Sequence, residues 1–574
     1  MSIFSSEKNR SFRAKILHTI ESFSLAEKIM FYAFVGLFAA SSLWLLSKAN
    51  DEFIVEVPAP GGELKEGVVG YPLFINPLLS VTDSGRDLTR LVYSGLLKAT
   101  PDGEFVNDIA ESYIVSEDGL TYSVKIRDDA YFHDGEKVTA EDVDFTIRKA
   151  IDPVLKSNKA PAWQGVEVEV IDEKNIEFHL KKPYAPFVEN LTLGILPKHI
   201  WGELGSDAFV YSKVNFEPIG SGPYRIANVS TNSAGLPEYY ELESFNKYTG
   251  GAPFIKRIFL HVYPTEGKLV EAFKKGEINA VGNISSSALN EVKKVAEDSE
   301  EINSPLPRIY GVFFNENTSS VLADANVRKA LDLAVNRQEI IDTALLGFGA
   351  PAYGPLPTVI SSIPPRDFNL EKATEILENA GFKKNEKGIY EKTEKTGKKT
   401  LQFSISTTNA PDLKKTAELL QASWQKLGAD VSLKIFDLSD LNQNVIRPRR
   451  YEALLFGEVI GRDLDLYAFW HSSERNDPGL NIAMYTNSKV DDILTKARQE
   501  TSTAKKIELY KSFETEIIKD TPAVFLFSPR SVYILPDDVK GVNLDGITSS
   551  SERFLEVNKW YIETEKVWKF FIKD

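Results

Sequence analysis

The sequence of 574 residues contains no cysteine. Without a thiol, the chain can form no disulfide, no thiolate metal site and no covalent thiol intermediate, and it cannot carry a lipid on cysteine. Histidine is also scarce: the six histidines are too scattered to supply paired metal ligands at helical spacing. We therefore expect no metal site and no cofactor.

The short motifs of catalysis are missing as well. The sequence holds no HExxH, no GxSxG, no Walker A loop and no EF-hand loop. His133, in the turn Phe132-His133-Asp134-Gly135, is the histidine that most suggests a general base, but a turn residue with local hydrogen bonds explains it better. We therefore predict that the chain is not an enzyme.

Positive charge is in deficit, because 67 lysines and arginines stand against 82 aspartates and glutamates and give a net charge of −15. A chain this acidic is repelled by phosphate backbones, so we expect no nucleic acid partner. The hydrophobic content of 43% is that of a globular protein. The length allows about three or four domain-sized units.

One long apolar run stands near the start of the chain. Residues 29–46 carry no charge and would span about 27 Å as a helix, close to the thickness of a hydrocarbon core. Basic residues gather before the run and acidic residues follow it, which predicts a single transmembrane anchor with its N-terminus in the cytoplasm. A signal peptide cleaved near Ser47-Lys48-Ala49 is the alternative, although the polar lead of 28 residues is long for one.

Beyond this run, short strands alternate with helices, which indicates an α/β fold. The clearest unit spans 401–436, where an alternating strand, an amphipathic helix and a second alternating strand predict the crossover of a parallel sheet. Helices are also expected over 324–346 and 371–380, each followed by glycine. A strand at 121–126 precedes a helix that Thr139 and Asp142 would start as an approximate capping box.

An acidic cluster with aromatic neighbours follows a run suited to a buried strand at 451–456. In open α/β sheets, ligands bind at the carboxyl ends of the strands. Carboxylates beside aromatic side chains suit a ligand that carries an ammonium group. The candidate ligand-binding residues are Glu458, Arg462, Asp463, Asp465, Tyr467 and Trp470. The alternative is a solvated charged loop above ordinary core aromatics.

A series of motifs runs through the chain from Gly61 onward. The most specific is SEDGLTYSVKIRDDAYFHDGEKVTAEDVDF, at 116–145, and others in order are LPKHIW (196–201), IGSGPYRI (219–226), NVRKALDLAVNRQEII (326–341) and RDLDLYAFWHSS (462–473). In this order the motifs resemble the family 5 extracellular solute-binding proteins of ABC importers, which include oligopeptide, dipeptide and nickel binders.

The resemblance implies a bilobal fold of the periplasmic-binding-protein type, type II, with an inserted extra subdomain and with lobes that close over the ligand. The lobes would be joined by crossing strands near 311–315 and 521–525. The expected boundaries are 1–28 for a cytoplasmic segment, 29–46 for the anchor, 47–60 for a tether, 61–86 with 215–308 and 525–574 for lobe I, 87–214 for the inserted subdomain, and 309–524 for lobe II.

The implied function is that of a membrane-anchored extracellular (or periplasmic) receptor that captures short peptides and delivers them to an ABC transporter permease; we expect a monomer. Peptide-binding relatives hold the ligand's amino terminus with an acidic residue after the strand that corresponds to 451–456. Glu458 is the nearest candidate for this role, with Asp463 and Asp465 close behind, and Tyr467 and Trp470 would wall a pocket.

Two departures from the family pattern accompany the resemblance. The usual Asp-Pro-Asp reads Asp463-Leu464-Asp465, and the cysteine that carries a lipid in relatives from one-membrane bacteria is absent, which favours the helical anchor. Other ligands on the same fold remain open, namely an opine, a sugar or a metal chelate. A non-transport surface scaffold and a tethered hydrolase are the alternatives from other classes, and the missing nucleophile and base motifs count against the hydrolase.

Overall fold

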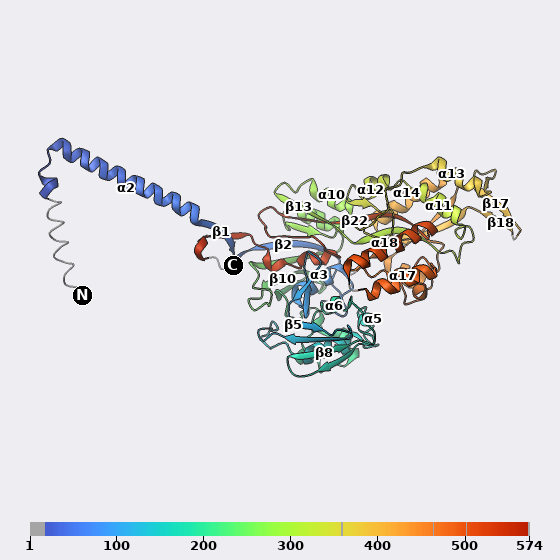
Figure 1. Cartoon of the computed structure of the whole chain (residues 1–574), viewed down its shortest axis with the longest axis horizontal. Coiled ribbons are helices and arrows are strands. Elements are labelled where there is room, and N and C mark those ends of the chain that lie inside the picture. Colours follow the sequence, from blue (N-terminus) through green and yellow to red (C-terminus); the bar gives the residue numbers. More distant parts are fainter. Residues whose placement is uncertain (1–17, 358–359, 396, 463, 501, 572–574) are drawn as a thin grey trace. The chain divides into compact units, whose positions relative to one another are not determined.

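The computed structural model describes residues 18–571 except 358–359, 396, 463 and 501. These residues form two units, one of which contains the chain before Pro60 together with the residues from Glu563 onward (Figure 1). The second unit is Pro60–Ile562. Each unit is described by itself.

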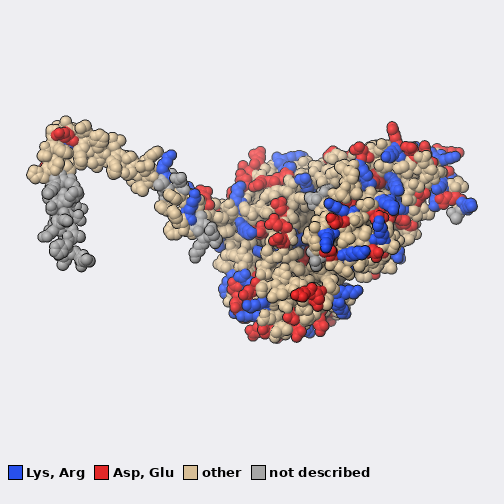
Figure 2. All heavy atoms as spheres, in the orientation of Figure 1, with Lys and Arg blue, Asp and Glu red and all other residues tan. Residues whose placement is uncertain are grey.

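The first unit is built on a long helix and a two-stranded ribbon. Helix α2 (Leu25–Phe53) contains a stretch, Leu25–Lys48, that is long and apolar enough to cross a membrane and is not buried against protein. Figure 2 shows a mostly uncharged surface along this helix. Strand β1 (Ile54–Ala59) follows and pairs antiparallel with β23 (Glu563–Trp568), after which comes the single turn η6 (Lys569–Phe571).

The second unit is organised around one twelve-stranded sheet. Along the sheet the order is β20 (Asp430–Phe436), β19 (Gln402–Thr408), β21 (Ala453–Val459), β14 (Arg308–Phe314), β22 (Ala523–Pro536), β12 (Ala280–Gly282), β2 (Gly61–Val69), β11 (Ile255–Tyr263), β10 (Pro237–Ser244) and β9 (Tyr224–Thr231), with β13 (Ser299–Pro305) and β15 (Gly349–Pro351) also paired to β22. We call β20, β19, β21 and β14 the β19 half, and β12, β2, β11, β10 and β9 the β2 half.

Strand β22 joins the two halves. The first part of its 14 residues pairs with β14, and the second part pairs with β12 and β13. Each half has its own buried apolar side chains. In the β19 half, Val312 and Phe314 of β14 face one core and Ile309 and Phe313 face the other, as the period of two in a strand requires. The unit is therefore bilobal.

Helices cover both faces of the β19 half. One core lies under α11 (Ala325–Leu333), α12 (Arg337–Ala344), α13 (Leu370–Asn379) and α14 (Pro411–Leu427), and the other under α16 (Tyr467–Trp470), α17 (Ser488–Gln499) and α18 (Thr503–Asp520). The short helix α15 (Leu438–Asp440) and the π-helix η2 (Leu441–Ile446) follow β20.

The β2 half packs α9 (Glu266–Lys274) and α10 (Ser286–Lys293) on one core. Its larger core is shared with α3 (Asp83–Val92) and with a small antiparallel sheet in the order β5 (Ala110–Val115), β6 (Thr121–Ile126), β8 (Asn175–His179), β7 (Glu167–Val170). The remaining elements are β3 (Leu97–Ala99), β4 (Phe105–Asn107), α4 (Ala140–Ala150), α5 (Ala160–Trp163), α6 (Phe187–Asn190), α7 (Lys198–Trp201), α8 (Ser206–Tyr211), the short turns η1 (Lys213–Asn215), η3 (Ser472–Arg475), η4 (Ser550–Phe554) and η5 (Val557–Lys559), and a three-stranded sheet of β16 (Lys383–Lys384), β17 (Tyr390–Glu394) and β18 (Gly397–Thr400).

Several local predictions are confirmed. Strands β19 and β20 are parallel and joined by α14, as the pattern at 401–436 indicates. Strand β6 occupies 121–126, and α4 begins with a capping box in which the Thr139 backbone N–H donates to Asp142 Oδ2 at 2.8 Å. Helix α13 ends before Gly381, whose φ of 88° stops the helix.

Two boundaries differ from the prediction. The helix expected over 324–346 is two helices, α11 and α12, because the Asn336 side chain accepts from the Glu339 backbone N–H at 3.1 Å and caps a new helix. The strand expected at 451–456 extends to Val459, so Glu458 lies inside β21 rather than after it. The alternation of the strand then turns the Glu458 side chain toward the core under α16.

Candidate functional site

In the segment between β21 and α16, the side chain of Arg462 reaches from the β19 half to segments that pack with the β2 half. Arg462 donates from Nη1 to the Gly546 carbonyl oxygen at 2.7 Å and to that of Thr100 at 3.3 Å. Its Nη2 donates to Glu552 Oε2 at 2.6 Å, and the Arg462 side chain is 4% exposed. All three acceptors belong to segments that pack with the β2 half. Arg462 therefore ties the two halves together by a buried ion pair.

A second bridge is centred on Asp465. Its Oδ2 accepts from Arg498 Nη2 at 2.7 Å and from the Tyr184 hydroxyl at 3.4 Å, so that residues of both halves meet on one carboxylate oxygen. The Arg498 guanidinium lies over the rings of Tyr184 and Tyr467, 5.2 and 4.2 Å from their centroids. The Asp465 carboxylate raises the pKa of Arg498 against the effect of burial, and the cation stays charged.

Contacts on another part of the same boundary were not predicted from the sequence. The Ser286 hydroxyl at the start of α10 donates to Asp412 Oδ2, in the first turn of α14, at 3.0 Å. The ammonium of Lys293 lies 5.0 Å from the ring centroid of Phe348. Serine, aspartate and lysine near helix ends are common, so no sequence signal marks these pairs.

Glu458 and Trp470 form a pair beneath this boundary. The indole Nε1 of Trp470 donates to Glu458 Oε2 at 3.1 Å, whereas Glu458 Oε1 has no hydrogen-bond partner among the described residues. Glu458 is 1% exposed, and burial raises its pKa well above the ordinary value. Trp470 is fully buried, and its ring centroid lies 6.0 to 6.2 Å from those of four aromatic residues, Phe313, Tyr485, Phe513 and Phe525.

This arrangement changes the expected role of Trp470. The sequence interpretation placed its ring in a pocket wall, but the ring lies in the core, and the indole N–H instead fixes the position of the Glu458 carboxyl group. An orphaned buried carboxyl oxygen is costly, by about 1 to 3 kcal/mol, and a cationic group would satisfy it. Glu458 is therefore the strongest candidate in the cluster for binding a positively charged ligand group.

The other predicted site residues divide into two groups. Tyr467 stacks on His471 with a centroid distance of 4.0 Å, and its backbone N–H donates to Asp465 Oδ1 at 3.2 Å. Asp465 and Tyr467 thus lie together beside Arg498, while Arg462 reaches toward Glu552 separately. Asp463 lies outside the described residues.

His133 has the structural role that the sequence favours. Its Nε2 lies 3.0 Å from the Gly222 carbonyl oxygen, and its Nδ1 accepts from the Gly220 backbone N–H at 3.3 Å. Burial lowers the pKa of His133 to about 4, so the imidazole is neutral near pH 7. Both ring nitrogens therefore form hydrogen bonds with backbone groups.

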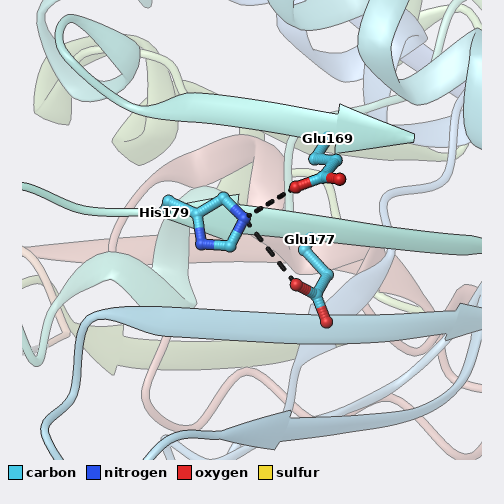
Figure 3. Close-up of side chains that lie close together, drawn as sticks. All are labelled: Glu169, Glu177 and His179. Atoms are coloured by element: carbon cyan, nitrogen blue, oxygen red, sulfur yellow. Dashed lines mark ion pairs between the residues drawn. The ribbon is translucent and has the colours of Figure 1, made fainter. Parts of the chain in front are cut away.

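One group on the small sheet has the side chains of a metal site. His179 Nε2 lies 3.4 Å from Glu169 Oε2 and 3.7 Å from Glu177 Oε2, and Figure 3 shows the imidazole between the two carboxylates. The strand register places Glu169 opposite Glu177, which the sequence alone does not reveal. The Glu169 side chain is 63% exposed. We assign this group to cross-strand ion pairing, away from the boundary between the halves.

Comparison with known proteins accords with this architecture. The family model for bacterial extracellular solute-binding proteins, family 5 Middle, matches residues 104–489. The chain is 28% identical over 520 residues to the oligopeptide-binding protein AppA of Bacillus subtilis, covering 88% of this chain and 92% of AppA.

Solved structures extend the comparison to the fold. The structure of AppA from Bacillus subtilis in complex with a nonapeptide has a TM-score of 0.73 at 26% identity and covers 88% of this chain and 100% of that one. NikZ from Campylobacter jejuni in complex with Ni(L-His) has a TM-score of 0.71 at 26% identity, with coverages of 87% and 99%. The expected periplasmic-binding-protein fold is confirmed, and the chain belongs to the family 5 bacterial extracellular solute-binding proteins, which are non-enzymatic receptors of ABC importers.

Proposed function

We propose that this receptor binds short peptides through their free amino terminus, and that a helical anchor holds it on the outer face of a membrane beside its permease. The observation that carries the proposal is the buried Glu458 carboxyl group, with one oxygen fixed by Trp470 and the other without a partner among the described residues. An α-ammonium group is a cation with three N–H donors, so it can donate the hydrogen bond that this oxygen lacks and balance a negative charge on the carboxylate. The relative AppA, named as an oligopeptide-binding protein, supports the same ligand class.

The lobes of the proposed receptor follow the boundaries expected from the sequence. Lobe I comprises 61–86, 215–308 and 525–562, the inserted subdomain 87–214, and lobe II 309–524; the one difference from the expected boundaries is that the residues from Glu563 onward, expected in lobe I, belong to the first unit, where β23 pairs with β1. The support is that β14 and β22 run through the junction between separate apolar cores. Rotation about these strands opens and closes the space between the lobes.

The closed form of the receptor is stabilised by the bridges around Arg462 and Asp465. The ligand adds contacts to both lobes, and the Arg462 ion pair and the Arg498 cluster add to the stability of the closed form without touching the ligand's side chains. Recognition of the peptide backbone and amino terminus then gives broad specificity. Asp465 lies at the rim of the site and Tyr467 provides its aromatic wall; Asp463, also expected to bind the ligand, lies outside the described residues.

The ligand class is tested by thermal shift of the purified full chain in detergent with matched ligands. We expect free-amine peptides of two to nine residues to raise the melting temperature, and the same peptides with an acetylated amino terminus to have little effect. Stabilisation by nickel–histidine, a sugar or an opine, with none by peptides, would contradict the proposal.

Replacing Arg462 by alanine tests the closure bridge. The variant loses a buried ion pair and two hydrogen bonds across the lobes, so we expect peptide to dissociate about 10-fold faster with little change in the association rate. Stopped-flow fluorescence measures both rates. The control is Arg148→Ala, which removes an exposed ion pair within α4 and should leave both rates unchanged. An unaltered dissociation rate for Arg462→Ala would refute the role.

The anchor has its own test. Because α2 offers an apolar stretch at Leu25–Lys48, we expect the protein to stay in the membrane fraction after extraction with alkaline carbonate. We also expect intact-mass measurement of this material to show that the apolar segment is retained. Release into the soluble fraction, with a new amino terminus near Asn50, would instead identify a cleaved signal peptide.

A further inference from the structure

Strand β23 brings an aromatic segment back to the end of α2. In the β1–β23 ribbon, Ile54 pairs with Trp568, so the residues that follow β23 lie beside the last residue of α2, Phe53. The ring centroids of Phe53 and Phe570 are 5.4 Å apart, and those of Trp568 and Phe570 are 6.4 Å apart. We call Phe53, Trp568, Phe570 and Phe571 the tail patch.

The tail patch is apolar and solvent-exposed. The exposed fractions are 41% for Phe53, 44% for Trp568, 70% for Phe570 and 80% for Phe571. By contrast, four tryptophans elsewhere in the described chain are fully buried in cores, namely Trp201, Trp424, Trp470 and Trp560. A contiguous cluster of exposed rings indicates a surface that another apolar phase covers.

The position of the tail patch along α2 identifies that phase. Near the end of the apolar stretch, the Lys48 ammonium lies 5.3 Å from the ring centroid of Trp44, the arrangement typical of the membrane–water interface. The seven residue steps from Leu46 to Phe53 rise about 10 Å along the helix. The interfacial layer on each side of a bilayer is about 5 to 8 Å thick, and aromatic side chains reach back several ångströms, so Phe53 and Phe570 stand at headgroup level.

We propose that the tail patch inserts into the bilayer interface and gives the ribbon a second attachment to the membrane next to α2. The inference rests on the proposed anchor. Aromatic rings favour this layer because their faces are apolar and the Trp568 indole N–H can reach water or a headgroup. The charges beside the patch are of both signs, as in the pair of Lys566 and Glu56 at 3.8 Å. Insertion therefore depends on apolar burial and not on anionic lipid.

The test is to measure the depth of single cysteines, which the cysteine-free chain allows without background labelling. The full chain, with a fluorophore at Lys569→Cys or Phe571→Cys, is placed in nanodiscs of phosphatidylcholine alone or mixed with anionic phosphatidylserine. Some of the lipids carry a nitroxide quencher either near the headgroup or deep in the acyl chain. Lys569→Cys keeps every ring of the tail patch. We expect the shallow quencher to reduce fluorescence at both positions about twofold, equally in neutral and anionic lipid.

Three controls separate the outcomes. Leu37→Cys, in the middle of the apolar stretch, reports the anchor and should respond to the deep quencher, whereas Tyr211→Cys, exposed on α8, should respond to neither. Combining Lys569→Cys with serine at Trp568, Phe570 and Phe571 should abolish the shallow quenching. Quenching at position 37 without quenching at 569 and 571 overturns the tail patch and leaves the anchor intact. No quenching at position 37 would refute the proposed anchor, and the proposed insertion of the tail patch, which depends on the anchor, would be refuted as well.

Discussion

Replacing Glu458 by glutamine is expected to weaken the binding of a free-amine peptide by about 100-fold. The substitution keeps the shape of the side chain and the acceptor for Trp470, but glutamine has no acidic proton to lose and so cannot become the carboxylate that pairs with the ligand's ammonium group. Loss of one partner of a buried ion pair costs about 3 kcal/mol or more, which corresponds to this change in affinity. Calorimetric titration with one peptide, in its free and acetylated forms, measures the effect, and the acetylated form should bind both proteins equally weakly.

The same substitution should stabilise the ligand-free protein at alkaline pH. The raised pKa of Glu458 means that the folded protein keeps a proton that the unfolded chain releases, so wild-type stability falls as pH rises from the ordinary glutamate pKa toward the folded-state pKa. Glutamine does not titrate. We therefore expect the difference in unfolding free energy to be small at about pH 4.5 and to favour Glu458→Gln by about 1 kcal/mol or more at about pH 8.

Glu514→Gln is the matched control for both effects. Glu514 is also fully buried in the β19 half, but its two carboxylate oxygens accept from the Ser361 hydroxyl at 2.7 Å and the Ser362 backbone N–H at 3.0 Å. Its substitution should leave peptide affinity unchanged and should not stabilise the protein. Equal affinities for wild type and Glu458→Gln would remove Glu458 from the binding site.

The second large effect is expected at Arg553, the centre of a buried charge group in the β2 half. Its guanidinium donates to Asp87 Oδ2 at 2.6 Å and to Glu66 Oε1 at 2.5 Å, and the three side chains are at most 3% exposed. Burial raises the pKa of both Glu66 and Asp87 against the opposing charge of Arg553. Arg553→Met leaves two buried carboxylates without a cation and should cost about 3 to 5 kcal/mol of stability.

Chemical denaturation of Arg553→Met at neutral and acidic pH measures this cost. We expect the deficit to shrink as pH falls, because protonation neutralises the two carboxylates. Two comparisons fix the cause. Arg257→Met, which removes exposed ion pairs from β11, should cost less than about 1 kcal/mol. Replacing Arg553, Glu66 and Asp87 together by Met, Leu and Leu should recover most of the stability, and a deficit as large as that of Arg553→Met would point to lost packing instead of unpaired charge.

Elements whose side chains alternate or recur over a few residues were predictable from the sequence. The crossover at 401–436 was predicted because the alternation of strands and the spacing of α14 are local patterns, and the local pattern also indicated the capping box of α4. The single helix expected over 324–346 was wrong because the apolar spacing continues across Asn336, whose cap divides it. The end of β21 was misplaced by three residues for a related reason, since Gly457 and Glu458 do not look like strand residues.

The candidate site could be predicted only in part. The cluster of charged and aromatic residues after β21 is visible in the sequence, but the partners of its members are distant along the chain: Arg462 binds Glu552, and Tyr184 reaches Asp465. Such pairs follow from the packing of the two halves and leave no local signal. Burial of Glu458 and Trp470 also depends on the strand register, which decides the face on which each side chain lies.

Native mass spectrometry of the purified full chain tests the central claim most directly. The protein is released from detergent without denaturation, and the mass of any retained ligand is read from the difference between bound and free protein. We predict a distribution of short-peptide masses, which exchanges for an added free-amine peptide and is lost in Glu458→Gln. A retained metal chelate, sugar or opine that peptides do not displace would contradict the assignment of this receptor to peptides.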